Sequence, residues 1–153
     1  MKLLLDSAYL LPALGISVKE VSKDALIRLM QKGYQIFVSE ISVFELSAKG
    51  AKYVTSGAIS AERVARGIRA IVYSETITMI PICEDAVPYA AFKLRALLND
   101  FIDCLILSTA MNHCDTLVTE DEDIQNLKRS KEFSELAAKI NPRFQIQTLK
   151  EIR

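Results

Sequence analysis

The chain has 153 residues, half of them apolar, and its 19 basic and 19 acidic side chains leave a formal net charge of zero. This length and composition predict one compact domain, residues 1–153, and exclude a protein that coats nucleic acid through a high overall positive charge. No apolar stretch approaches the roughly 20 residues that span a bilayer, and the N-terminal apolar run is too short for a signal peptide. We therefore expect a cytoplasmic protein without a membrane partner.

The first half of the chain alternates short apolar runs with helical patterns. We predict strands at 2–5, 34–38 and 76–80, where apolar and β-branched residues lie between turn signals. Helices are predicted from 23 to 30, around Glu45, and from 61 to 71, where Ser60 can cap the first turn.

The second half continues the same alternation. We predict helices at 84–98, 101–113, 124–127 and 133–139, and strands at 116–119 and 144–149. Strands that alternate with helices pair in parallel through right-handed crossovers. The predicted fold class is therefore α/β, a three-layer α/β/α sandwich around a mainly parallel sheet of four to five strands.

Four acidic residues lie where this fold presents side chains at strand ends or helix starts. Asp6 closes the first strand, and Asp121 follows the fourth. Glu45 lies past the second strand, and Asp103 opens an apolar helix. Ligands of open parallel sheets bind at the carboxyl ends of the strands, and gathered carboxylates repel one another unless protons or cations neutralise them. We therefore predict a site for a hard cation, Mg²⁺ or Mn²⁺, and phosphate chemistry.

Each acid also has an ordinary structural explanation. Asp6 can cap the segment that follows it, and Asp103 can accompany Asp100 at the start of its helix. The acidic run 119–123 can be a solvated turn, and Glu45 an exposed helical glutamate.

The order of these segments resembles the PIN-domain family, which includes the VapC-type ribonuclease toxins. The resemblance rests on residues 3–7, 39–46, 103–110 and 117–121, and it extends over nearly the whole chain. It implies an acidic quartet with hydroxyl and carboxylate helpers. The quartet is Asp6, Glu45, Asp103 and Asp121, and the supporting residues are Ser7, Thr119 and Asp123. One departure is Ala8, two positions after Asp6, where the family most often has Asn or Ser.

We therefore expect metal-dependent hydrolysis of phosphodiester bonds in single-stranded RNA. Asp6 and Asp103 are the expected principal ligands. Asp121 is a second ligand, and Glu45 a ligand or an orienter of water. The resemblance further implies a toxin of a toxin–antitoxin pair, with a small antitoxin partner, and a homodimer.

A possible RNA contact is the series Arg63, Arg66 and Arg69 on one predicted helix, although a solvated helix face is the favoured explanation. Two other functions stay open. A non-catalytic PIN-like module for RNA binding or assembly is one. An α/β phosphatase is the other, but such enzymes need a second Asp where this chain has Ala8.

Overall fold

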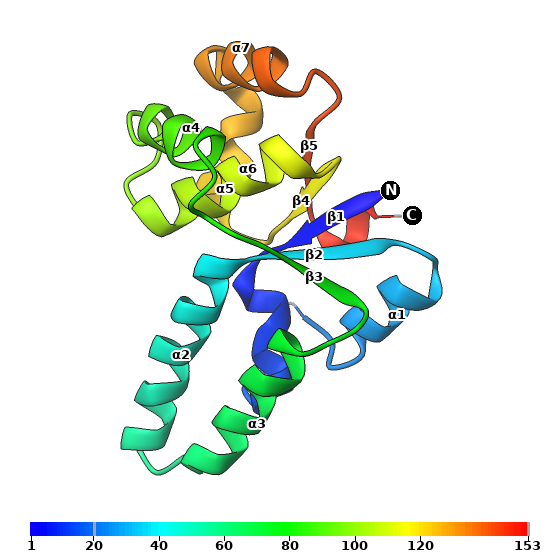
Figure 1. Cartoon of the computed structure of the whole chain (residues 1–153), viewed down its shortest axis with the longest axis vertical. Helices are drawn as coiled ribbons and strands as arrows, with labels where there is room; N and C mark the ends of the chain where they lie inside the picture. The colour runs from blue at the N-terminus through cyan, green and yellow to red at the C-terminus, as the bar shows by residue number, and fades with distance from the viewer. Residues whose placement is uncertain (20, 153) are drawn as a thin grey trace.

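The computed structural model describes residues 1–19 and 21–152, which form a five-stranded parallel sheet with helices on both faces (Figure 1). The strand order is β3-β2-β1-β4-β5. The strands are β1 (Lys2–Leu5), β2 (Gln35–Ser39), β3 (Ile77–Ile80), β4 (Thr116–Val118) and β5 (Gln145–Gln147). The predicted fold class is confirmed.

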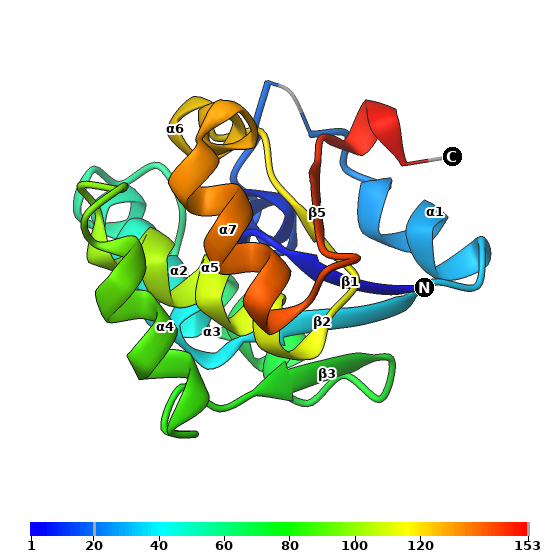
Figure 2. The same ribbon diagram turned by 90° about the horizontal axis from the view of Figure 1, so that it is seen from above.

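The helices fall into two groups, one on each side of the sheet (Figures 1 and 2). The first group comprises α4 (Ala86–Leu94), α5 (Phe101–His113), α6 (Glu122–Asn126), the 3-10 turn η2 (Leu127–Arg129) and α7 (Lys131–Ile140). The second comprises the 3-10 helix η1 (Ser7–Leu14), α1 (Ala25–Gln31), α2 (Glu40–Thr55) and α3 (Ala61–Val72). A short 3-10 turn, η3 (Leu149–Glu151), follows β5. No helix in the described part of the chain is long and apolar enough to cross a membrane.

The alternation of side chains along β1 builds the core on both faces of the sheet. Leu3 and Leu5 pack with residues of α1, whereas Leu4 packs with residues of α4 and α5. All three leucines are fully buried. Successive residues of a strand point to opposite faces, so the apolar run of β1 is what a strand covered on both faces requires.

The connection that follows β3 places β4 on the other side of β1. After β1 the chain forms β2 and β3 on one side, and then returns through α4 and α5 to form β4. The Asp6 amide donates to the Val118 carbonyl at 3.0 Å, which extends this pairing by one residue. In open α/β sheets, the crevice between two such strands at their carboxyl ends is where ligands bind.

Three segments differ from the prediction. Residues 7–14 form the unpredicted helix η1, which packs under α3. The helix predicted from 84 to 98 ends at Leu94, because the chain then tightens into turns, and the Arg95 guanidinium donates to the Leu98 carbonyl. The last strand is shorter than 144–149, because Thr148 begins a capping box with Glu151.

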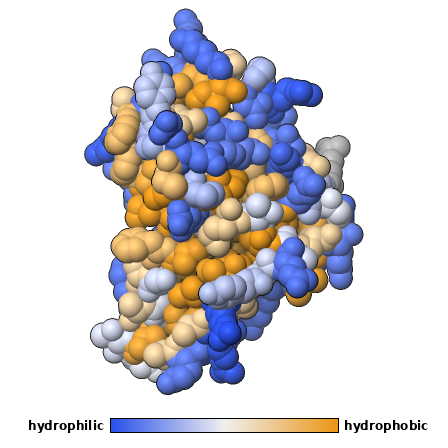
Figure 3. All heavy atoms as spheres, in the orientation of Figure 1, coloured by the Kyte–Doolittle hydropathy of each residue, from blue (hydrophilic) through white to orange (hydrophobic). Residues whose placement is uncertain are grey.

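The α2/α3 pair extends away from the sheet, and α3 packs closely on η1 (Figure 1). A Cβ atom at Gly67 would lie 2.5 Å from the Ala13 carbonyl oxygen, so this contact requires glycine. Val64 and Ile71 of α3 are buried against η1 and α2. The apolar stripe of α3 therefore serves the core. Apolar side chains also gather across the middle of the face in Figure 3, over β3 and the beginning of α2.

Candidate functional site

Asp6 lies in the crevice and is held by a hydroxyl from the neighbouring strand end. Its carboxylate is almost wholly buried and accepts a hydrogen bond from Thr119 Oγ1 to Oδ2 at 2.6 Å. The Ser7 hydroxyl lies 3.4 Å from Oδ1, at the outer limit of a hydrogen bond. Both predicted hydroxyl helpers therefore lie beside Asp6, and Thr119 makes the stronger contact.

Thr119 also connects Asp6 to Asp121. The Asp121 amide donates to Thr119 Oγ1 at 3.1 Å, so one hydroxyl lies between the two acidic residues. Asp121 caps α6, since its Oδ1 accepts from the Ile124 amide at 2.9 Å. This is the ordinary capping role, and among the described residues Oδ2 has no hydrogen-bond partner. Asp123 lies in the first turn of α6 and is exposed.

Glu45 reaches the same region from α2. Its Oε1 pairs with Lys49 Nζ, one turn further along the helix, at 2.7 Å. Its Oε2 is buried and has no hydrogen-bond partner among the described residues. A buried carboxylate oxygen without a partner is costly, so this atom is the clearest sign that a ligand completes the site.

Asp103 shows how closely the four acids are associated. It lies in the first turn of α5, after the cap residue Asp100, whose Oδ1 accepts from the Ile102 amide. Burial raises the pKa of Asp103 to about 7, and neighbouring negative charges add to this effect. The charges are those of Asp100, Asp121, Asp6 and Glu45. Asp103 is therefore within electrostatic range of the other three predicted acids.

The pKa of Asp6 is raised for related reasons. Burial is the largest cause, and the negative charge of Glu45 adds to it. The Thr119 hydrogen bond, the Ser7 backbone amide and the Lys49 charge act in the opposite direction. A bound cation would stabilise the ionised forms of Asp6 and Asp103, which burial and neighbouring negative charge disfavour.

The residues fit a hard divalent cation by their chemistry, although the carboxylates do not yet converge on one point. In residues 1–19 and 21–152, no three His, Cys, Asp or Glu side chains are close enough to form a ready-made metal-binding group. The donors available are carboxylate and hydroxyl oxygens, which Mg²⁺ and Mn²⁺ prefer. The unpaired Oε2 of Glu45 supplies a free donor atom.

The loop after β4 carries a hydrogen-bond network that the sequence did not predict. The Tyr9 hydroxyl donates to Glu120 Oε1 at 2.7 Å, and the same oxygen accepts from the Leu149 amide at 3.0 Å. Gln125 Nε2 donates to the Thr119 carbonyl at 2.7 Å. These bonds hold the loop after β4 against η1 and η3. Only the position of Glu120 beside Asp121 in the acidic run gave a sequence signal.

The three predicted arginines lie on α3, whose first turn is at the far end of the α2/α3 pair in Figure 1. The Arg63 guanidinium donates to the Ala13 carbonyl at 2.6 Å and is partly buried. Arg69 lies over the Tyr73 ring, and Arg66 is exposed. Arg63 thus has a structural contact, and the series is not one free basic stripe.

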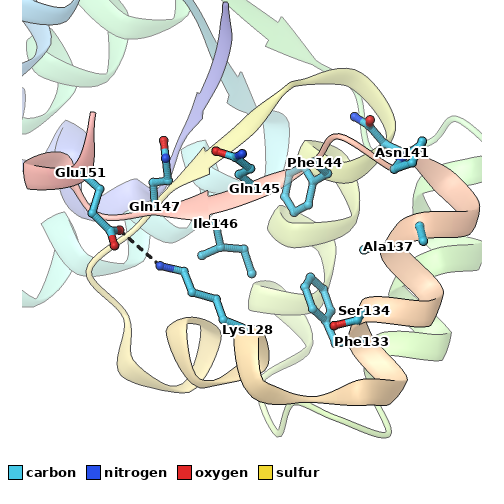
Figure 4. A pocket seen from close by; sticks show the side chains of 12 residues that line it. Lys128, Phe133, Ser134, Ala137, Asn141, Phe144, Gln145, Ile146, Gln147 and Glu151 are labelled. Carbon is cyan, nitrogen blue, oxygen red and sulfur yellow. Dashed lines mark hydrogen bonds and ion pairs between the residues drawn. The ribbon is translucent and has the colours of Figure 1, made fainter. Parts of the chain in front are cut away.

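His113 and a separate cavity both lie apart from the acids. His113 Nε2 lies 3.0 Å from Glu84 Oε2, at the opposite end of α5 from Asp103. A cavity of about 460 Å³ lies between β5 and α7 (Figure 4), and none of the four acids lines it. Its polar lining includes the Lys128–Glu151 ion pair, at 3.2 Å.

Comparisons with known proteins bear on the family and the fold of the chain. A family model described as PIN domain matches residues 3–130. A solved structure with a similar fold is that of VapBC2 from Rickettsia felis bound to a DNA fragment from their promoter. It matches with a TM-score of 0.61 and 18% identity, over 97% of this chain and 98% of that chain. At that identity the match supports the fold alone. No curated protein sequence matches the chain.

Proposed function

Because this chain belongs to the PIN-domain family, we propose that it is a metal-dependent nuclease that hydrolyses phosphodiester bonds in single-stranded RNA. PIN domains are generally nucleases and typically depend on divalent metal. The observation that carries the proposal is that Asp6 and Asp121 lie at the carboxyl ends of the paired strands β1 and β4, with the buried, unpaired Oε2 of Glu45 within electrostatic range of Asp6. Such a group suits phosphoryl chemistry better than a purely structural role.

We assign the roles from position. Asp6 and Asp103 would be the principal ligands of Mg²⁺ or Mn²⁺, Asp121 a further ligand, and Glu45 a ligand or an orienter of water. When bound, such a cation lowers the pKa of a coordinated water and neutralises charge on the transferring phosphate. Thr119 orients the Asp6 carboxylate through Oδ2. Because burial and neighbouring negative charge raise the pKa of Asp103 to about 7, its carboxyl can hold a proton near neutral pH and would release that proton on binding a cation.

For the biological role we propose the toxin of a toxin–antitoxin pair, acting as a single domain of residues 1–153 and as a homodimer. The support is the family membership and the likeness in fold to one chain of the VapBC2 structure. A small antitoxin would then be the protein partner. Co-expression with the product of the neighbouring reading frame tests this role. Relief of growth inhibition by that product is the expected result, and a lack of growth inhibition by the chain alone argues against it.

The catalytic proposal is tested by cleavage of single-stranded RNA in Mn²⁺. We expect cleavage by the wild type, a loss of at least a hundredfold in Asp103→Asn, and no change in Asp85→Asn, which replaces an exposed acid outside the site. Equal cleavage by the wild type and Asp103→Asn, after contaminating ribonuclease is excluded, would overturn the mechanism. Stabilisation by Mn²⁺ without any cleavage would favour the non-catalytic module. Release of phosphate from small phosphomonoesters would favour the phosphatase.

A further inference from the structure

Exposed aromatic rings lie on the outer face of α4 and at the start of α5, the helix that carries Asp103. Val87, Ala91 and Leu94 form the buried face of α4, whereas Tyr89 and Phe92 point outward and are 64% and 67% exposed. Single exposed apolar residues are common on protein surfaces. Large rings three positions apart, on the same face of one helix, form a continuous surface instead.

The rings are already stacked. Phe92 and Phe101 have centroids 5.5 Å apart and ring planes within 18° of parallel. Phe101 is the first residue of α5, so this contact joins the outer face of α4 to the helix that carries Asp103. Since Phe92 is 67% exposed, most of its ring surface stays open beyond Phe101.

A cation lies within the same surface. Lys93 Nζ lies over the Tyr89 ring, 4.3 Å from its centroid. Charged residues are depleted at the centres of protein–protein interfaces, whereas rings interleaved with a cation suit a polyanion whose bases can stack. Exposed Asp85 and Asp100 lie at the starts of α4 and α5, so the attraction for a nucleic-acid strand comes from Lys93 and the rings and not from the net charge of the surface.

The position of the stacked rings relative to the acids determines which nucleotide of a bound strand they can contact. Two residues turn an α-helix by roughly 200°, so Phe101 and Asp103 point to opposite sides of the first turn of α5. The stacked pair therefore flanks the carboxylates and does not face them. A base on this pair would belong to a nucleotide next to the one whose phosphate reaches Asp103.

We propose that Phe92 and Phe101 form a stacking platform for a base of single-stranded RNA, with Lys93 contacting an adjacent phosphate. This inference rests on the proposed nuclease function and adds the means by which the strand is held. A platform of this kind is tolerant of sequence, because every base has a π-face. It holds the strand in the single-stranded form that the site requires, since paired bases are not free to stack on a protein.

The test measures binding apart from cleavage, in an Asp103→Asn background that leaves the strand intact. The probe is a short single-stranded oligoribonucleotide containing 2-aminopurine, compared with a chain of the same length in which abasic sites replace the bases. We expect Phe92→Ala to weaken binding of the intact probe about tenfold, to leave binding of the abasic chain unchanged, and to remove the quenching of 2-aminopurine. Phe92→Trp should restore both affinity and quenching. The matched control is Tyr73→Ala, which removes an exposed ring that also contacts a cation, directly after α3.

Three results would overturn the platform. The first is wild-type affinity in Phe92→Ala, and the second is an equal loss of affinity for the intact and abasic probes. The third is a change in oligomeric mass by light scattering without any change in RNA binding, which would make this surface a protein contact. The two proposals fail separately. If the protein stacks the RNA base but cleaves no RNA, the platform stands and the nuclease proposal fails. If cleavage depends on Asp103 but Phe92→Ala binds RNA as the wild type does, the nuclease proposal stands and the platform fails.

Discussion

Replacing Asp103 with asparagine should stabilise the metal-free protein at pH 8 while it removes the proposed activity. Burial and the neighbouring negative charges raise the pKa of Asp103 from the ordinary 3.8 to about 7. Each pH unit of such a shift corresponds to about 1.4 kcal/mol, so the ionised side chain costs the folded state up to about 4 kcal/mol. Solvent screening of this partly exposed carboxyl and relaxation of the neighbouring carboxylates lower this figure. We expect a gain of about 2 kcal/mol, or a rise in Tm of about 4–8 °C for a domain of this size.

The sign follows from proton linkage. In the folded protein Asp103 keeps its proton to about pH 7, whereas in the unfolded chain it releases the proton near pH 3.8. The folded state therefore binds more protons between these values, and this group makes the wild type less stable as the pH rises through them. Asparagine does not titrate. The wild type and Asp103→Asn should be similar in stability at pH 4 and differ most at pH 8.

Thermal unfolding in EDTA at pH 4, 6 and 8, followed by circular dichroism, measures this difference. Asp85→Asn serves as the control, because it removes an exposed acid outside the site. Addition of Mn²⁺ at pH 8 should raise the Tm of the wild type and have little effect on Asp103→Asn. A variant that is no more stable than the wild type at pH 8, or that gains equally at pH 4, would refute the reasoning.

Three further substitutions test the contacts around the site. Thr119→Val removes the hydrogen bond to Asp6 while keeping the shape of the side chain. We expect the free energy of unfolding, measured in urea at pH 8, to fall by about 2 kcal/mol, and Mn²⁺ to bind more weakly by calorimetry. Unchanged Mn²⁺ affinity would contradict the orienting role of Thr119. Lys49→Met removes the cation that pairs with Glu45 Oε1, so Mn²⁺ should bind a few-fold more tightly, and weaker binding would show that Lys49 does not compete with the metal. Gly67→Ala places a Cβ atom 2.5 Å from the Ala13 carbonyl oxygen. We expect the free energy of unfolding in urea to fall by about 1–3 kcal/mol, although alanine has the better helix propensity. An equal or higher stability would mean that η1 shifts freely to make room for the Cβ atom.

Periodicity and end signals were enough to predict most of the secondary structure. The run Leu3 to Leu5 needs burial on both faces, so it indicated a central parallel strand, and β1 is the middle strand of the sheet. Ser60 and Asp100 cap the helices that were expected to follow them. η1 was missed because its residues have no regular amphipathic period, and Pro12 lies inside it.

The sequence predicted that Asp6, Glu45, Asp103 and Asp121 share one site, from the parallel topology together with the resemblance to the PIN-domain family. The alternation of strands and helices likewise followed from local patterns along the chain. Only the tertiary structure decided how each carboxylate is satisfied. Asp6 faces Thr119, a contact between residues 113 positions apart, and Glu45 pairs with Lys49 but keeps one buried oxygen free. Local patterns set which elements form, whereas burial and the pKa of a carboxyl depend on groups that only folding brings near. The same holds for Arg63, whose spacing suggested a basic stripe but whose guanidinium is bound to the Ala13 carbonyl.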